Sequence, residues 1–374
     1  MITTNDIQRL IQRDGNGHEF LSLFLDMSVN SDNKRTHQIF LAKEKAAFTE
    51  LQSDREKHHR EPLGAVFSKV DRWIDETYEP TNKGVVLYAE IGGDWFQAFQ
   101  FPTPVQNRLA VLPYPVIGPL TQLMHNHPKF GVIIVDREHL WLLSVHMGVL
   151  GDEHRFEPDA IPTPHDVQAG GYSHKDYQSR KAEETRQFYK DFVEEITRFE
   201  RRVGIDQFFL LGTTENTQNF RDFLPRTIAE RVVHVAHAPS AATGSELVKH
   251  LQPVFEELAE RGEAEAMDLL QERISQSHFA TSGVHDTLIQ LQEGKVERLV
   301  VARGLEREGV QCTRCGFYLA RRDGACPYCG GELREGIDLV ESMIRLAANQ
   351  SARIDFVAAD DVPDLREVGA LLKF

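Results

Sequence analysis

The chain has 374 residues, 41% of them hydrophobic and 26% charged, which is ordinary for soluble globular protein and long enough for two or three domains. Its net charge of −15 argues against a general nucleic-acid binder, although a local basic surface on an acidic body is compatible with it. No apolar run approaches the roughly 20 residues of a membrane span, and the first residues do not have the pattern of a secretory leader. We therefore expect a cytoplasmic protein with no membrane partner.

Residues 1–126 are predicted to form a first α/β domain. Apolar spacing indicates a short helix through Ile7–Ile11, then a strand, two helices joined by a basic turn, and three further strands. The strands are expected at Phe20–Leu25, Val85–Tyr88, Trp95–Phe99 and Leu109–Leu112. The helices are expected between Thr36 and Tyr78, on either side of the turn Lys57–Arg60.

Residues 127–243 are predicted to form a second α/β domain with parallel strands. A hairpin comes first and a long amphipathic helix, ending near Val203, follows it. The remaining pattern of strand, short helix and strand requires crossover connections and hence parallel pairing. The expected strands are Phe130–Val135, Trp141–Val145, Phe208–Leu211 and Val232–Val235, and the short helix is expected at Phe220–Leu224.

Residues 244–374 are predicted to form a third α/β domain behind a helical connector. The connector runs from Gly244 to about Ser275, and the next helix is closed by Gly294, a residue typical of helix C-termini. Further elements are expected at Gly283–Gly294, Arg298–Ala302, Leu339–Ala347 and Ile354–Ala358. A cysteine-bearing mini-domain, residues 310–333, interrupts this series between a strand and a helix.

All four cysteines of the chain fall in this mini-domain, as two Cys-x-x-Cys pairs separated by ten residues: Cys312, Cys315, Cys326 and Cys329. A glycine after each pair allows the backbone to turn, so that its amides face the sulfurs. Four thiolates at this spacing fit tetrahedral zinc better than a disulfide framework. Because no coordination position stays open, we expect the zinc ion to be structural.

The stretch from Pro164 to Val203, with Pro162 just before it, is the second notable feature. Two prolines, Pro162 and Pro164, favour an extended segment, and Gly170 and Gly171 permit backbone angles or close approaches that a side chain would forbid. Ser173 is a plausible N-cap for the long helix, whose first half is basic. On local pattern alone, the simplest interpretation is a surface loop that leads into an amphipathic helix.

Other candidate sites have simpler interpretations. His58 and His59 fit a solvated turn, and His125 and His127 flank a domain boundary with no carboxylate cluster nearby in the sequence. Neither a nucleophile elbow nor a phosphate-binding loop of the Walker type is present. Spacing alone therefore predicts no conventional catalytic constellation.

Taken together, these segments resemble the class-1 peptide chain release factors of eukaryotes and archaea and their relative Pelota, a ribosome rescue factor. Four collinear segments carry the resemblance: Lys129–Asp136, Gln168–Arg180, Gly283–Leu288 continuing to Lys295–Val301, and the cysteine mini-domain. It implies a three-domain α/β architecture with a zinc-ribbon insertion. In this architecture the first domain faces the decoding centre of the ribosome and the second faces the peptidyl-transferase centre.

Two departures from the family pattern concern activity. Tyr172 stands where release factors have the glutamine that helps to place the attacking water. The family's stop-codon-reading Asn-Ile-Lys-Ser motif is missing, and Asp54–Arg60 occupies the corresponding helix pair. The profile is most similar to Pelota-related bacterial ribosome hibernation factors of the Balon type. The resemblance therefore implies a non-enzymatic hibernation factor that occupies the A site and keeps ribosomes inactive.

The same resemblance implies the partners and the contact residues. The partners are the ribosome, through small-subunit and large-subunit ribosomal RNA, and elongation factor Tu; the chain itself is expected to be monomeric. The contacts expected at the peptidyl-transferase centre are Gln168, Ala169, Gly170, Gly171, Tyr172, Ser173, His174, Lys175, Arg180 and Lys181. Those expected at the decoding centre are Asn30, Asn33, Lys34, Arg35, Lys57, His58, His59 and Arg60.

Two alternatives stay open at this point. The chain could be a release or rescue factor that hydrolyses peptidyl-tRNA with the Tyr172 backbone amide or with Gln168. It could also be an interaction protein that recruits a partner off the ribosome through its C-terminal domain and zinc projection. A release assay tests the first alternative, and changes at residues 168–180 test the second.

Overall fold

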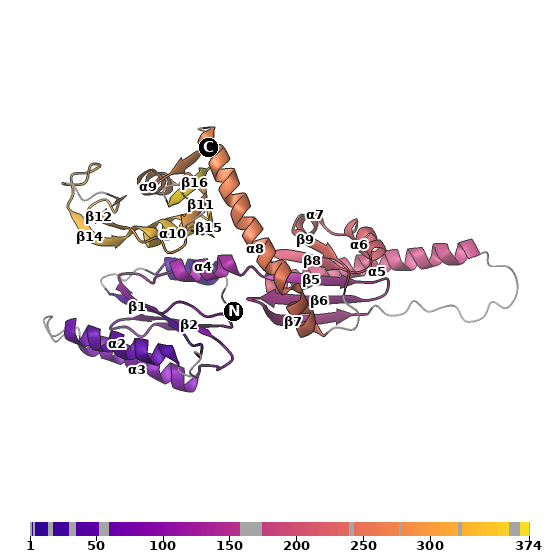
Figure 1. Cartoon of the computed structure of the whole chain (residues 1–374), viewed down its shortest axis with the longest axis horizontal. Coiled ribbons are helices and arrows are strands. Elements are labelled where there is room, and N and C mark those ends of the chain that lie inside the picture. The colour runs from indigo at the N-terminus through magenta and orange to yellow at the C-terminus, as the bar shows by residue number, and fades with distance from the viewer. Residues whose placement is uncertain are drawn as a thin grey trace. The chain divides into compact units, whose positions relative to one another are not determined.

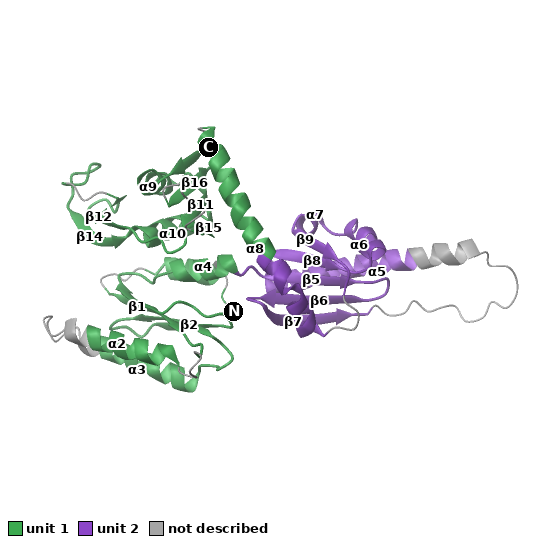
Figure 2. Cartoon of the chain, viewed as in Figure 1, with its two compact units in different colours: residues 1–126, 257–374 green, residues 127–256 purple. Residues whose placement is uncertain are grey.

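This computed structural model describes residues 2, 4–13, 18–29, 35–51, 60–157, 174–238, 243–276, 279–320, 324–358 and 367–373. The chain forms two compact units (Figures 1 and 2): unit 1 contains residues 1–126 and 257–374, and unit 2 contains residues 127–256. Helices and four sheets in the described residues confirm the mixed α/β class. None of the described helices combines the length and apolar character that a membrane crossing requires.

The N-terminal part of unit 1 is an antiparallel sheet covered by two helices. Its strands are β1 (Phe20–Asp26), β2 (Gly84–Glu90), β3 (Phe96–Phe101) and β4 (Arg108–Leu112), in the order β3-β2-β1-β4. Helices α2 (Thr36–Leu51) and α3 (Arg60–Glu76) pack on one face and bury a core around Leu23, Leu63 and Val70. These elements confirm the predicted strands and helices of this region. The predicted turn at residues 57–60 lies almost entirely outside the described residues.

The C-terminal part of unit 1 holds a second sheet, in the order β10-β16-β11-β15. Its strands are β10 (Ala280–Ser282), β11 (Val296–Ala302), β15 (Arg353–Val357) and β16 (Val368–Leu372), and its helices are α9 (Val284–Gln292) and α10 (Leu339–Asn349). The long helix α8 (Gly244–Ser275) brings Met267 and Leu270 into the core of this sheet. Strands β10 and β16 were not predicted, whereas the other elements of this region were.

Two helices from the N-terminal part complete the C-terminal layer. Helix α1 (Thr4–Ile11) contacts α10, and α4 (Gly118–Asn126) contacts both α10 and β15. The Glu341 carboxylate is buried here, with Oε1 accepting from the Ile117 N–H and Oε2 from the Gly118 N–H, both at 2.8 Å. Helix α4 was not predicted. We call this contact region the α4–α10 junction; the predicted three-domain division stays a prediction.

Unit 2 is built on a five-stranded sheet in the order β7-β6-β5-β8-β9. Its strands are β5 (Phe130–Val135), β6 (Leu140–His146), β7 (Val149–Phe156), β8 (Gln207–Leu211) and β9 (Val232–Ala236). Strands β5, β8 and β9 are parallel, as predicted, and β6 forms the predicted hairpin with β5. Strand β7, at the edge beside β6, was not predicted.

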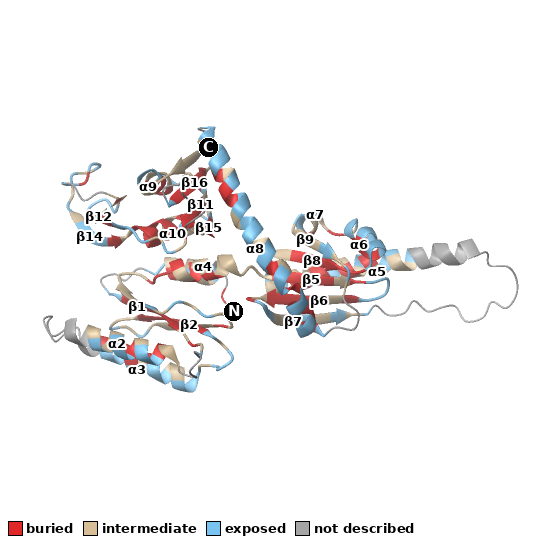
Figure 3. Ribbon diagram, in the orientation of Figure 1, coloured by how far each residue is buried: buried red, intermediate tan, exposed pale blue. Residues whose placement is uncertain are grey.

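The helices of unit 2 are α5 (His174–Val203), α6 (Thr214–Arg221) and α7 (Arg226–Ala229). The α5 face with Tyr189, Phe192, Ile196 and Phe199 belongs to the buried core of this sheet. Figure 3 shows buried residues, in red, along the central strands of the sheet. The prediction of a helix at Phe220–Leu224 was wrong. The helix begins earlier because the Thr213 hydroxyl caps it by accepting from the Asn216 N–H.

Candidate functional site

The four cysteines lie on a small sheet that is inserted between β11 and α10. This sheet comprises β12 (Glu308–Cys312), β13 (Tyr318–Leu319) and β14 (Leu333–Asp338), in the order β13-β12-β14. The four sulfur atoms all lie within 4.8 Å of one another. The Cys312 and Cys329 sulfurs are 3.4 Å apart, and those of Cys315 and Cys326 are 3.7 Å apart.

Tight turns bring the sulfurs together. In the first knuckle Gly316 has φ +75° and donates its N–H to the Cys312 carbonyl, and in the second Gly330 has φ +68° and donates to Cys326. At Gly331 a side chain would meet the Cys312 sulfur at 3.0 Å, so this close approach also requires glycine. The predicted link between the glycines and the knuckles is therefore visible in the backbone.

The donor set fits one metal ion. The sulfur separations are far longer than the roughly 2.05 Å of a disulfide, and they suit four thiolates about 2.3 Å from a shared tetrahedral ion. With no ion bound, the Cys315 N–H directed at the Cys312 sulfur lowers the pKa of the Cys312 thiol to about 6. At Cys315, by contrast, the lowering effect of the Phe317 N–H is outweighed by burial and the three neighbouring sulfurs, which raise the pKa to about 12. A cation at the centre would remove this competition for negative charge. The four cysteines thus form a possible metal site that is consistent with a zinc ribbon.

The predicted loop lies outside the described residues, which stop at Glu157 and resume at His174. Gln168, Ala169, Gly170, Gly171, Tyr172 and Ser173 fall in this gap. His174, Lys175, Arg180 and Lys181 belong to the start of α5, but their side chains are also outside the description. The described stem of the loop is well packed, because Phe156 at the end of β7 contacts Phe192 of α5 edge-to-face.

Most of the predicted decoding-centre contacts also lie outside the described residues. This applies to Asn30, Asn33, Lys34, Lys57, His58 and His59, and to the side chain of Arg60 at the start of α3. Arg35 is described: it forms an isolated bridge with Val29, and its guanidinium lies 5.9 Å from the centre of the Tyr78 ring. These residues remain predictions.

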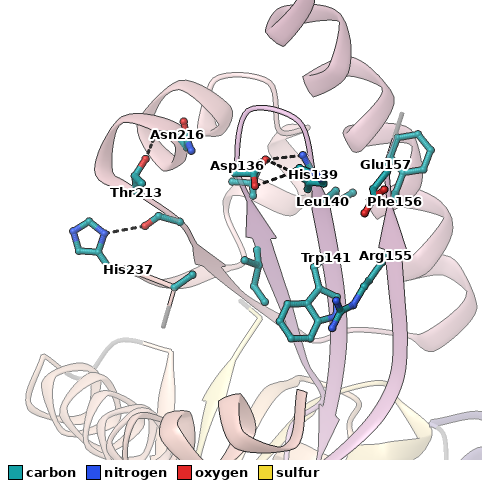
Figure 4. Close-up of a pocket in the computed structure, with 14 residues that line it drawn as sticks. Asp136, His139, Leu140, Trp141, Arg155, Phe156, Glu157, Thr213, Asn216 and His237 are labelled. Carbon is teal, nitrogen blue, oxygen red and sulfur yellow. Dashed lines mark hydrogen bonds and ion pairs between the residues drawn. The ribbon is translucent and has the colours of Figure 1, made fainter. Parts of the chain in front are cut away.

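Unit 2 contains a cavity that the sequence did not predict (Figure 4). It has a volume of about 350 Å³ and lies where β5 and β8 reach their carboxyl ends. Its polar wall includes Asp136, His139, Arg155, Thr213, Asn216 and His237. Asp136, directly after a buried strand, and Thr213, at a helix start, are signals that could have pointed to it.

Hydrogen bonds fix several of these side chains. The Asp136 Oδ1 atom accepts from the N–H groups of Glu138 at 2.7 Å and His139 at 2.6 Å, and the His139 ring nitrogen Nδ1 lies 3.0 Å from Oδ2. His237 Nδ1 lies 3.1 Å from the Gly212 carbonyl oxygen, an acceptor, so Nδ1 is the donor in this pair. The cavity is therefore preformed by its own side chains.

Comparison with known families finds one match. Residues 115–256 match the model of bacterial archaeo-eukaryotic release factor family 10. The matched segment contains all of unit 2 and, before it, residues 115–126 of unit 1, and it includes the predicted loop. This supports the resemblance to the release-factor and Pelota superfamily for the central part of the chain. None of the curated proteins matches the sequence.

Several solved structures are similar to the chain. The archaeal translation termination factor aRF1 is 16% identical over 100% of this chain and 99% of its own, with a TM-score of 0.28. Dom34 of S. cerevisiae, a translation termination-like factor, is 10% identical over 79% of this chain and 82% of its own, with a TM-score of 0.43. A ribosome-bound archaeal Pelota is 13% identical over 100% of this chain and 94% of its own, with a TM-score of 0.41.

Proposed function

We propose that this protein is a ribosome-binding factor that occupies vacant A sites and keeps ribosomes inactive without hydrolysing peptidyl-tRNA. The observation that carries the proposal is the release-factor family match over residues 115–256. This range includes Gly170-Gly171-Tyr172, which the resemblance aligns with the family's Gly-Gly-Gln loop. A chain of the Balon type would enter the A site with elongation factor Tu. Its first domain would meet the decoding centre.

The length of α5 supports a reach of this kind. Of the α5 side chains that the structure describes, which start at Glu183, the first that join the core are Phe188 and Tyr189, whereas the helix begins at His174. At 1.5 Å per residue, about 20 Å of helix precedes the core contact. A loop at the end of such a helix can enter a narrow site while the sheet stays outside it.

Tyr172 argues against hydrolysis. A glutamine amide can both donate and accept hydrogen bonds and so help to place water against the ester, whereas a phenol is bulkier and lacks the amide geometry. A tyrosine ring can instead stack on an RNA base, a contact worth roughly 1–3 kcal/mol in other systems. We propose that Tyr172 fills the peptidyl-transferase centre, and that the four-cysteine site holds zinc and serves only to fold its small sheet.

Co-sedimentation with ribosomes at moderate salt tests the binding. Reversal of charge at Arg180 and Lys181 should reduce the bound fraction by at least tenfold, since both cations would meet phosphates. In the matched control, the charge is reversed at Arg201 and Arg202, two exposed arginines in the last turn of the same helix. Equal loss in both variants, or no binding by the wild type, would remove the proposal.

A release assay on ribosomes that carry peptidyl-tRNA separates this proposal from the release-factor alternative, which the family description favours. We expect the wild type to release peptide no faster than a variant that lacks Gly170 and Gly171. Tyr172→Gln serves as the matched comparison because it restores the family's residue at that position. Release by the wild type above the loop-deleted control would establish the enzyme instead.

A further inference from the structure

The cavity of unit 2 lies at a place that parallel sheets use for ligands. Parallel strands carry their carboxyl ends to one edge, and ligands commonly bind in the crevice outside it. Here Asp136 comes directly after β5 and His237 directly after β9, whereas Gly212 separates Thr213 from the end of β8. Figure 4 shows Thr213, Asn216 and His237 on one side of the cavity, with Trp141 and Arg155 on the other.

One wall is suited to an acceptor group of a ligand. Thr213 and Asn216 belong to the N-terminal turn of α6, where helix amides and the helix dipole favour negative charge. Asn216 is only 6% exposed, and in the part of the chain that the structure describes its side-chain amide makes no hydrogen bond. Of the described residues, Asn216 is not one whose side-chain polar atoms are both fully buried and unpartnered, so its amide keeps contact with the solvent of the cavity. A ligand oxygen at this position can replace water as the partner of that amide.

The neighbouring wall is suited to donor groups. Among the described residues, the Asp136 Oδ2 atom accepts a hydrogen bond from the His139 ring alone, which leaves it further lone pairs. Glu157, an exposed carboxylate, also lines the cavity. Hydroxyl or amino groups of a ligand are the natural partners for such oxygens.

The third wall is flat. The Arg155 guanidinium lies 4.3 Å from the centre of the Trp141 ring, and the Glu153 carboxylate holds both groups by accepting from Trp141 Nε1 at 2.9 Å and from Arg155 Nε at 3.2 Å. A planar base can stack on the indole or on the guanidinium plane.

The charge around the cavity distinguishes between two ligands with this chemistry, a nucleotide within an RNA chain and a free nucleotide. Three carboxylates, those of Asp136, Glu157 and Glu153, lie in or beside the cavity, and among the described residues that line it Arg155 is the only lysine or arginine. A phosphodiester carries one negative charge, whereas the terminal phosphate of a free nucleotide carries close to two. We propose that the cavity binds one nucleotide of an RNA chain, with its phosphodiester at Asn216, its hydroxyls toward Asp136, and its base on the Trp141–Arg155 pair.

This inference goes beyond the A-site proposal and does not depend on it. Isolated oligonucleotides test it without ribosomes. Conversely, ribosome binding through the 168–173 loop can survive the loss of the cavity. Failure of one proposal therefore leaves the other standing.

The experiment titrates the full chain with a single-stranded adenosine trinucleotide and, separately, with adenosine 5′-monophosphate, and follows tryptophan fluorescence. Trp141→Phe identifies the part of the signal that comes from the cavity. We expect the trinucleotide to quench Trp141 and to bind at least tenfold more tightly than the mononucleotide. Asn216→Leu, similar in volume, should weaken trinucleotide binding by about tenfold.

Arg226→Gln is the matched control, because Arg226 is an exposed arginine on α7 of the same unit and does not line the cavity. It should bind as the wild type does. Unchanged binding by a folded Asn216→Leu variant, or no binding of either probe by the wild type, would overturn the proposal. Equal binding of the two probes would overturn the assignment to RNA and favour a free nucleotide.

Discussion

The core of unit 2 and the α4–α10 junction of unit 1 are held together by different chemistry. Around α5 the core is aliphatic and aromatic, with Tyr189, Phe192 and Phe220 in mutual contact. At the junction the contacts are charged and polar: Glu341 binds the start of α4, and Arg345 donates to the carbonyls of Pro115 and Ile11 at 2.9 Å each. Of the described residues, the only buried carboxylates, Glu341 and Asp355, lie in unit 1.

This difference bears on how each region can change. Apolar burial is nondirectional and tolerates small shifts, so a core of this kind is insensitive to pH. Buried charges are stable only with partners in good geometry, and removal of one partner leaves the other unpaired. We therefore expect changes of charge or pH to leave the core of unit 2 packed, and the α4–α10 junction to be the place where a single charge change separates two layers.

The largest expected loss of stability lies outside these two regions, in the cysteine-bearing sheet β12–β14, when its metal ligands are removed. Structural thiolate sites supply roughly 10–16 kcal/mol of metal binding energy, which such small sheets use to fold. Replacement of Cys326 and Cys329 by serine, or chelation, should abolish amide protection in β12–β14. Hydrogen exchange followed by mass spectrometry should find unit 2 unchanged. Loss of all secondary structure in circular dichroism would contradict this view.

In unit 2, Phe192→Ala removes a fully buried ring and should lower the free energy of unfolding by about 3–5 kcal/mol. Chemical denaturation monitored by hydrogen exchange in α5 and β8 measures the loss. The control is Val149→Ala, at a side chain that is 49% exposed in the same unit, with an expected change below about 0.5 kcal/mol. A Phe192 effect as small as that of the control would refute the role of this core.

At the junction, Glu341→Ala should lower the stability of unit 1 by about 3 kcal/mol, because the Ile117 and Gly118 amides lose their acceptor. Glu335→Ala, an exposed acid on β14, is the control and should change little. Exchange should increase first in α4. Gly118→Ala should act in the same direction, since its added carbon would lie 2.8 Å from the Glu341 Oε2 atom. Unchanged exchange in α4 would show that the two layers do not depend on this carboxylate.

The smallest effect is a pH dependence at Asp355. Burial raises the pKa of this carboxyl, but hydrogen bonds and charge from His125 and Arg298 outweigh burial and leave the pKa below its ordinary value. A depressed folded-state pKa gives stability that is present above the unfolded value, near 3.8, and is lost as the pH falls through the folded value. The free energy of unfolding of the wild type, compared with that of Asp355→Asn, should therefore decrease on acidification below about pH 4. A stability difference between the two proteins that does not change with pH would contradict the lowered pKa of Asp355.

The sequence predicted those elements whose pattern lies within the element itself, such as helical periodicity or cysteine spacing. The α5 periodicity predicted both the helix and its buried face, and the cysteine spacing predicted the cluster. Strand β7 escaped prediction because it is an edge strand with polar side chains and no clear alternation. Helix α4 escaped because the acid at its N-terminus, Glu341, lies 223 residues away from Gly118 in the sequence.

The cavity was not predicted because its residues are far apart in the sequence. Asp136, Thr213 and His237 come together only through the parallel order of β5, β8 and β9, although each follows a strand that was predicted. The loop residues 168–173 lie outside the described part of the chain but inside the family match over residues 115–256. Most decoding-centre residues lie outside both, so their roles rest on the resemblance alone.

A cryo-electron microscopy map of the protein bound to a ribosome that carries peptidyl-tRNA would test the central claim most directly. Our account predicts Gly170-Gly171-Tyr172 at the peptidyl-transferase centre, the Tyr172 ring against an RNA base, and an intact ester. A map with the central domain away from the A site, or with the peptide released, would contradict it.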